Sequence, residues 1–214
     1  MTMKEKQTEH SPLSPSTCER WWHCPRSVRE IAKLPEQPAN FYMAEGTVAH
    51  SVAERVVKGI IAREHKDMYE PIVGTFVKQE GFKVPITSEM IDAAYEYADY
   101  ILGTADADYI PYKRIQLEQR VVVDESLRLF GTSDCVMTGM SMLIVDDFKY
   151  GAGTYVPVAD NKQLRYYALG AYKMLPDTRK PEIKYVRIGI CQPRMKGTEN
   201  EVIPVQDILD LSKS

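Results

Sequence analysis

The sequence lacks several features that would set it apart from ordinary globular proteins. No run of apolar residues approaches the roughly 18 that a membrane-spanning helix needs, so we expect no membrane span. The first residues, MTMKEKQTEHSPLSP, are polar and charged without an apolar core, so we expect no secretory signal there. No internal repeat and no low-complexity tract is present, which excludes repeat architectures.

Cysteine is scarce as well, and its spacing excludes the usual metal-binding patterns. The four cysteines are Cys18, Cys24, Cys135 and Cys191, and no two of them form a C-x-x-C pair. Structural zinc sites usually draw their ligands from such close pairs, so we expect none here. The pattern favours free thiols in a reducing compartment, which predicts a cytoplasmic protein.

An excess of positive charge is also absent. The chain has 214 residues with 27 Lys and Arg against 30 Asp and Glu, a net charge of −3. This balance excludes a generally basic, nucleic-acid-coating protein, but it leaves room for a local basic groove. The hydrophobic fraction of 44% supplies enough apolar material for a sizeable core. We expect a flexible N-terminus over residues 1–10 and a single domain over residues 11–214.

Periodic apolar residues predict three helices in the first half of the sequence. They run from about residue 18 to 34, from 46 to about 65, and from 87 past 101, with a loop over 35–40. Pro25 lies inside the first helix and predicts a kink or a new start there. Residues 66–86 show no clear period and stay unassigned.

After residue 108 the pattern changes to that of strands. Alternation predicts strands over 115–123, over 127–137 with a break near Gly131, over 142–148 and over 183–190. A helix rich in Tyr and Ala is predicted over 163–174, and a last helix over 206–211. This order predicts an α/β fold, with a small mixed sheet flanked by helices and a helical segment at the N-terminus.

Three charged residues at the central strands carry a chemical signal. Asp134 comes early in a strand just after Gly131, and Asp147 and Lys149 end the apolar strand that follows. Residues two apart in a strand point to the same side, so Asp147 and Lys149 are expected to face one site that Asp134 also reaches. Two carboxylates suit Mg²⁺ or Mn²⁺, and a lysine beside them can hold a phosphate. The alternative is a solvated strand end and an ordinary turn residue.

Four motifs in order strengthen the first interpretation. They are Glu45-Gly-Thr-Val-Ala-His50, Gly131-Thr-Ser-Asp134, Val145-Asp-Asp-Phe-Lys149-Tyr-Gly151 and Gln163-Leu-Arg-Tyr-Tyr167. They resemble the G-x-x-x-H, G-x-x-D, D-x-K-x-G and Q-x-x-x-Y motifs of the RecB-like branch of the PD-(D/E)XK nuclease superfamily, in particular its phage-encoded exonucleases. The resemblance extends from about residue 11 to residue 205 and implies a restriction-endonuclease-like core.

The resemblance also implies roles for individual residues. It implies a Mg²⁺ or Mn²⁺ site, a catalytic lysine and two DNA-positioning residues: His50, Asp134, Asp147 and the carbonyl of Phe148 for the metal, Lys149 for catalysis, and Gln163 and Tyr167 for the DNA. A groove for DNA is expected along Lys149, Lys162, Gln163, Arg165 and Tyr167. For His50, simple packing stays open as the alternative. For Glu118, pairing with Arg120 or Lys149 and a part in catalysis all stay open.

The implied function is a metal-dependent DNA nuclease, an exonuclease in phage recombination or DNA end processing. Its expected partners are DNA and a recombination or single-strand-annealing protein, a homo-oligomer is compatible with it, and its location is the bacterial cytoplasm if the chain is phage-encoded. Some relatives bind an iron–sulfur cluster through one early and three C-terminal cysteines. Cys24 resembles the early one, but the C-terminal triplet is absent, so we expect no cluster. Two alternatives stay open: a catalytically weak DNA- or partner-binding module that keeps the fold, and a nuclease that acts on RNA.

Overall fold

The fold is that of a computed structural model, which describes residues 11, 13–35, 38–63, 72–195 and 197–211. The flexible N-terminus predicted over residues 1–10 lies outside these described residues. The elements along the chain are η1 (Pro15–Thr17), α1 (Cys18–His23), α2 (Arg26–Ile31), α3 (Phe41–Ile61), β1 (Phe76–Gln79), β2 (Phe82–Pro85), α4 (Ser88–Ala107), η4 (Tyr112–Arg114), β3 (Ile115–Asp124), β4 (Leu129–Thr138), β5 (Met142–Phe148), α5 (Lys162–Met174), η5 (Lys180–Glu182), β6 (Tyr185–Gln192), β7 (Gly197–Pro204) and α6 (Val205–Asp210).

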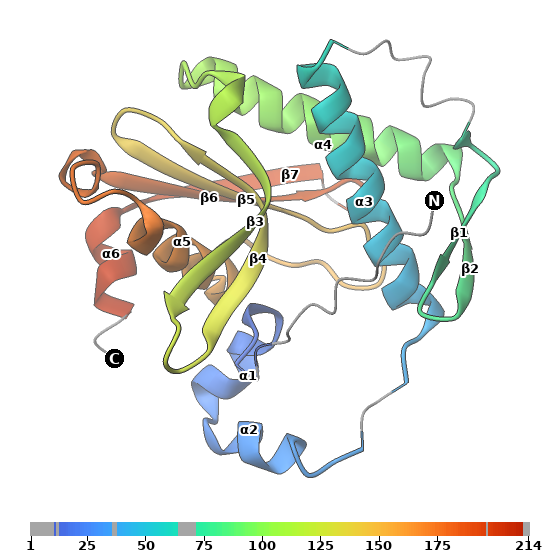
Figure 1. The fold of residues 1–214 in the computed structure, drawn as a ribbon, viewed down its shortest axis with the longest axis horizontal. Helices are drawn as coiled ribbons and strands as arrows, with labels where there is room; N and C mark the ends of the chain where they lie inside the picture. Colours follow the sequence, from blue (N-terminus) through green and yellow to red (C-terminus); the bar gives the residue numbers. More distant parts are fainter. Residues whose placement is uncertain (1–10, 12, 36–37, 64–71, 196, 212–214) are drawn as a thin grey trace.

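The main sheet has the strand order β3-β4-β5-β6-β7, so its strands neighbour one another in chain order. β5 and β6 are parallel, and the other neighbouring pairs are antiparallel. A parallel pair needs a crossover, which α5 provides between β5 and β6. The hairpin of β1 and β2 forms a separate two-stranded sheet next to α3, where Phe82 packs edge-on against Phe41 with 6.2 Å between ring centroids (Figure 1).

The two faces of the main sheet carry separate cores because side chains alternate along each strand. In β5, Ile144 and Phe148 belong to the core shared with α3 and α4, whereas Leu143 and Val145 belong to the core shared with α5 and α6. Figure 1 shows these two pairs of helices on opposite sides of the sheet. Because β5 is covered on both faces, its sequence is a continuous apolar run rather than an alternation.

Side-chain caps set where the long helices begin. Asn40 accepts a 3.0 Å hydrogen bond from the backbone N–H of Met43 at the start of α3, and Thr87 accepts one of 3.1 Å from Met90 at the start of α4. The start of α4 agrees with the predicted helix start at residue 87, but α3 begins five residues before its predicted start at residue 46. Pro25 gives a new start, since α1 and α2 are separate short helices on its two sides.

Gly131 does not break its strand, which corrects the sequence-based prediction. β4 runs without interruption from Leu129 to Thr138. The glycine serves close packing instead, because a Cβ atom at this position would lie 2.4 Å from Cγ of Pro15 and 3.1 Å from a ring carbon of Tyr167. The segment before α1 and the face of α5 thus approach the sheet through this position.

The sequence did not predict three of the strands, which are β1, β2 and β7. In β7 partly buried residues alternate with exposed ones along a largely polar sequence, and β1 is almost entirely exposed. β7 is an edge strand, and its backbone pairing with β6 holds it in place although its apolar pattern is weak. The pairing of a polar edge strand therefore depends on its neighbour.

The predicted α/β architecture is confirmed: a mixed sheet flanked by helices follows an N-terminal helical segment, and the arrangement is consistent with a restriction-endonuclease-like core. Among the described residues, no helix combines the length and the apolar character that crossing a membrane requires.

Candidate metal centre

Asp134 lies at the point where β4, β5 and α3 come together. The Nδ1 atom of His50, on α3, lies 3.2 Å from one carboxylate oxygen of Asp134. The backbone N–H of Phe148, at the end of β5, donates a 2.7 Å hydrogen bond to the other oxygen. Asp134 is therefore held from two sides, by a helix and by the neighbouring strand.

Glu118 on β3 reaches the same place through an irregular backbone. Its φ of 48° lies in the left-handed region, which a glutamate rarely adopts. Leu117 packs against the core of α3 and α4, while Gln119 lines a cavity against α5, so the alternation of faces is reversed at Glu118. The strand pairing passes from Leu117 opposite Cys135 to Gln119 opposite Ser133. The reversal is what adds a carboxylate from β3 to the α3 side of the sheet.

His50, Glu118 and Asp134 lie close enough together to hold a metal ion. One ligand atom from each residue lies within 4.8 Å of the others. Two carboxylate oxygens with one imidazole nitrogen suit a divalent cation such as Mn²⁺ or Mg²⁺. The chemistry and spacing of the donors therefore fit the metal that the sequence motifs implied.

The charges of this cluster are balanced between its members. Burial alone would lower the pKa of His50, but the carboxylate of Asp134 raises it from 6.5 to about 9. Burial alone would raise the pKa of Asp134, but His50 keeps it below its ordinary value of 3.8. The Glu118 residue is exposed overall, yet burial of its carboxyl end and the charge of Asp134 raise its pKa from 4.5 to about 7. A protonated His50 therefore neutralises Asp134 in the metal-free protein, and a cation at this place would replace that proton.

Lys149 leads from the end of β5 to helix α5 through a chain of polar contacts. Its ammonium nitrogen lies 2.8 Å from an oxygen of Asp147 and donates a 3.3 Å hydrogen bond to the side-chain oxygen of Gln163. The amide of Gln163 in turn donates a 3.1 Å hydrogen bond to the hydroxyl of Tyr167. Burial raises the pKa of Asp147; burial would lower that of Lys149, but the Asp147 carboxylate raises it. The ammonium group thus stays charged and has a fixed direction.

Aromatic rings pack against His50. The ring of Phe148 stands edge-on to the imidazole at 5.4 Å and lies 5.0 Å from the ring of Tyr97. The Tyr97 hydroxyl is buried and has no hydrogen-bond partner within the described part of the chain. These contacts restrict the orientation of His50, so its Nδ1 atom stays directed at Asp134.

A comparison with known protein families places the chain. Residues 10–214 match the family described as "Protein of unknown function (DUF2800)". The chain belongs to the DUF2800 family. Because the match extends over every residue of the metal centre, the centre lies within the family's own domain. The family description names no activity, so the nuclease resemblance of this DUF2800 protein stays a prediction.

The structure of the DUF2800 protein brings the predicted residues together in two groups. His50 and Asp134 share one cluster, whose third member is Glu118 rather than Asp147. Asp147 lies beside it, paired with Lys149 and still close enough for its charge to act on His50. Of Phe148 the structure shows the N–H bonded to Asp134, and the role expected for its carbonyl stays a prediction.

The structure bears on two neighbouring predictions. Glu118 lies with His50 and Asp134, whereas Arg120 pairs with Glu125 at 2.9 Å and Lys149 pairs with Asp147 at 2.8 Å. Arg165 does not flank an open groove in this DUF2800 protein: its side chain, only 13% exposed, lies 3.3 Å from Asp160 and 3.8 Å from Glu201. Residues two apart on a helix point to nearly opposite sides, so Arg165 cannot share the face of Gln163. Tyr167 itself is only 6% exposed.

The sequence predicted that Glu118 lies on a strand, but it did not decide the role of this residue. A strand with regular alternation would direct residues 116 and 118 to the same face, and nothing in the local sequence marks the reversal. The signal is the left-handed φ, which the tertiary structure shows and the local sequence does not.

Proposed function

We propose that this protein is a metal-dependent DNA nuclease that hydrolyses phosphodiester bonds, with exonuclease activity in DNA recombination or end processing. The observation that carries the proposal is the ligand cluster of His50, Glu118 and Asp134 next to the ion pair of Asp147 and Lys149. The ordered motifs that resemble RecB-like nucleases supply further support, because the motif residues His50 and Asp134 lie in the cluster and Asp147 and Lys149 form the ion pair beside it.

The residues that would hold the cation are His50, Glu118 and Asp134, with Asp147 beside them. A Mg²⁺ or Mn²⁺ ion there supplies positive charge that stabilises the negative charge developing on a phosphate during hydrolysis. Phe148 contributes by fixing the carboxylate of Asp134 through its N–H. The cluster is thereby preorganised before any substrate arrives.

Lys149 is the residue proposed to act on the phosphate or on the attacking water. Its side chain is 29% exposed, so the ammonium group keeps access to a substrate while Asp147 and Gln163 hold it. Electrostatic stabilisation works best when donors are already oriented toward the developing charge. Gln163 and Tyr167 then act on the DNA mainly through Lys149, since Tyr167 is buried.

A cleavage assay tests the proposal. Linear, circular and single-stranded DNA, together with RNA, are incubated with the protein in Mg²⁺, in Mn²⁺ and in EDTA. We expect metal-dependent cleavage of DNA, its loss in Asp134→Asn and in Lys149→Ala, and its retention in Asp92→Asn, which changes an exposed carboxylate on α4. Cleavage by Asp134→Asn at the wild-type rate would refute the assignment of the site.

A second candidate is a DNA-binding module with little catalytic power. One observation favours it, because the pair of His50 and Asp134 is balanced without a metal and links α3 to the sheet as a structural contact. Retention of DNA in a mobility-shift assay without any cleavage, and no stabilisation by Mn²⁺, would support this candidate over the nuclease.

A further inference from the structure

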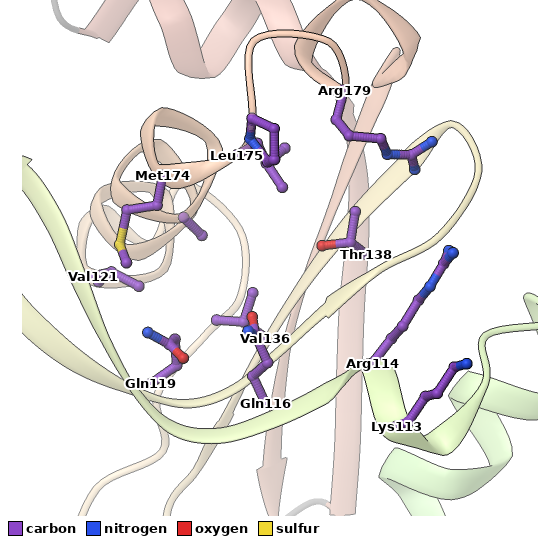
Figure 2. Close-up of a pocket in the computed structure, with 12 residues that line it drawn as sticks. Lys113, Arg114, Gln116, Gln119, Val121, Val136, Thr138, Met174, Leu175 and Arg179 are labelled. Atoms are coloured by element: carbon purple, nitrogen blue, oxygen red, sulfur yellow. The ribbon is translucent and has the colours of Figure 1, made fainter.

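A second site lies on the other face of the sheet. A cavity of about 420 Å³ opens between η4, β3, β4 and the C-terminal end of α5, a volume within the range of small-molecule pockets. Val121 and Val136 in its wall belong to the core shared with α5 and α6 (Figure 2). His50 of the metal centre is part of α3, which covers the opposite face of the sheet in Figure 1. The cavity is therefore separate from the proposed nuclease site.

One side of this cavity gathers three cations. Figure 2 shows Lys113, Arg114 and Arg179 along the same side, from two different segments of the chain. Arg179 is held in place, because it donates a 2.7 Å hydrogen bond to the carbonyl of Gly139 and pairs with Glu182. Among the described residues, Lys113 and Arg114 have no ion-pair partner.

The positive charges of Lys113 and Arg114 repel each other and that of Arg179. An anion in the cavity would relieve that repulsion. Guanidinium groups match the oxygens of a phosphate in a two-pronged geometry, and a phosphate monoester carries enough charge to engage several cations. The cationic side therefore fits a phosphate group.

The opposite side of the cavity has a different character. Met174, Leu175 and Pro176 supply an apolar surface over the buried Val121 and Val136. The amides of Gln116 and Gln119 lie at its edge. An aliphatic surface can cover the flat face of a ring, and an amide both donates and accepts hydrogen bonds, as the edge of a nucleobase does. Apolar, amide and cationic groups thus follow one another across a space of about 420 Å³.

We infer that this cavity binds a nucleoside phosphate, with the phosphate against Lys113, Arg114 and Arg179 and the base on the aliphatic side near Gln116 and Gln119. The ligand is either a free nucleotide or the terminal nucleotide of a nucleic-acid strand, which present the same groups. The inference goes beyond the proposed nuclease activity and does not rest on it, since it uses none of the metal-centre residues.

Calorimetric titration in EDTA tests the inference, because EDTA removes any contribution of the metal centre. The probes are dAMP, deoxyadenosine and inorganic phosphate. We expect saturable binding of dAMP and at least about tenfold weaker binding of the other two, since each lacks one half of the ligand. Lys113→Gln and Arg114→Gln should each weaken dAMP binding by about tenfold, the loss of one charge-assisted contact.

Three controls make the result specific. Lys78→Gln removes an exposed cation on β1 and should bind dAMP like the wild type, and Asp134→Asn should do the same. Thermal unfolding of every variant checks that the fold is kept. A 5′-phosphorylated pentanucleotide separates the two sources: tighter binding than dAMP identifies a strand end, and equal binding identifies a single nucleotide.

The inference is overturned by any of three results. They are the absence of saturable dAMP binding, equal affinity for inorganic phosphate and dAMP, which means an adventitious anion only, and undiminished dAMP affinity in Arg114→Gln and Lys113→Gln. Loss of DNA cleavage in Asp134→Asn has no bearing on it, so the two proposals fail separately.

Discussion

Glu118 holds a backbone conformation that its residue type rarely adopts, with φ at 48° in the middle of β3. Non-glycine residues in this region are strained by about 1–3 kcal/mol and persist where the surrounding structure fixes them. Here the strain places a carboxyl group with a raised pKa beside Asp134, an arrangement that repulsion opposes unless a cation is bound. The strain and the repulsion are both consistent with selection for a metal ligand rather than for stability.

Replacing this carboxylate should separate metal binding from stability. Above about pH 7 the ionised Glu118 destabilises the metal-free fold, so Glu118→Gln should raise the melting temperature in EDTA. The same change removes a ligand, and a tenfold weaker Kd would take about 1.4 kcal/mol from the stabilisation by excess Mn²⁺. Thermal unfolding with and without Mn²⁺ measures both effects.

Glu80→Gln is the matched control, because Glu80 also has a positive φ, of 49°, but lies in the exposed turn between β1 and β2. It should leave the response to Mn²⁺ unchanged. If the two variants respond alike to Mn²⁺, Glu118 is not a ligand.

The pH dependence of metal binding should follow the pKa of His50. An ordinary histidine would be neutral above about pH 6.5, but Asp134 keeps His50 protonated up to about pH 9. Because a metal must displace that proton, Mg²⁺ affinity should rise as pH increases from about 7 to about 9, by up to about tenfold per unit. Below about pH 7, Glu118 is also protonated, so a metal must displace a second proton there.

Calorimetric Kd values for Mg²⁺ across this range provide the measurement. His50→Gln has no imidazolium proton to displace, so its affinity should rise less with pH than that of the wild type and should be flat near pH 9. An affinity of the wild type that is equal at the two ends of the range would mean that His50 is only a packing residue.

At the scale of secondary structure, α5 connects the end of β5 with the rest of the sheet. In its first turn, Gln163 holds Lys149. In its middle, Tyr167 packs next to Gly131. Its last turn lines the cavity proposed to bind a nucleoside phosphate, here called the nucleotide cavity. Tyr167 is thus a buried residue whose hydroxyl accepts the hydrogen bond that orients the side chain of Gln163. The polar face of one helix orients the proposed catalytic lysine while its apolar face packs on β3 and β4.

Tyr167→Phe should therefore lower kcat without changing KM. The change keeps the ring and its packing but removes the acceptor for Gln163, and the loss of one neutral hydrogen bond corresponds to about 2- to 10-fold in rate. Steady-state cleavage kinetics give the two constants. Tyr172→Phe on the same helix, whose hydroxyl donates to the carbonyl of Lys180, should keep both constants. A rise in KM alone would show instead that Tyr167 contacts DNA directly.

At the scale of the whole molecule, charge is unevenly distributed around a net value of −3. Of the three cations that the sequence places along a DNA groove, Arg165 is engaged by Asp160 and Glu201, which leaves Lys149 and Lys162. The three cations of the nucleotide cavity lie on the other face of the sheet. If the protein binds DNA at the proposed metal centre, we therefore expect the long-range attraction of DNA to be weak.

The salt dependence of DNA binding should be correspondingly shallow. Each phosphate neutralised on duplex DNA contributes a slope of about −0.9 in log K against log salt, so two cations predict about −2. Binding measured in Ca²⁺ across a salt series gives the slope without turnover, and Lys162→Gln should reduce it by about one unit. A slope several units steeper would show that DNA engages further cations, those of the opposite face included.

The sequence by itself determined what depends on neighbours along the chain. The apolar run of β5, the cap at Thr87 and the side-by-side placement of Asp147 and Lys149 all follow from spacing over a few residues. Helix and strand periodicity act at this range, so the α/β class and most of the elements could be predicted. The motifs also named His50 and Asp134, although they lie far apart in the sequence, through resemblance rather than geometry.

Only the tertiary structure decided what depends on contacts between distant segments. The reversal of β3 at Glu118 arises where it pairs with β4, Gly131 is explained by the approach of Pro15, and Arg165 is engaged by Glu201 on β7. The polar edge strand β7 forms because β6 offers it backbone hydrogen bonds. The physical reason is that local pattern fixes which face of an element is apolar, whereas the neighbours packed against it fix the backbone irregularities and the pairing of its charges.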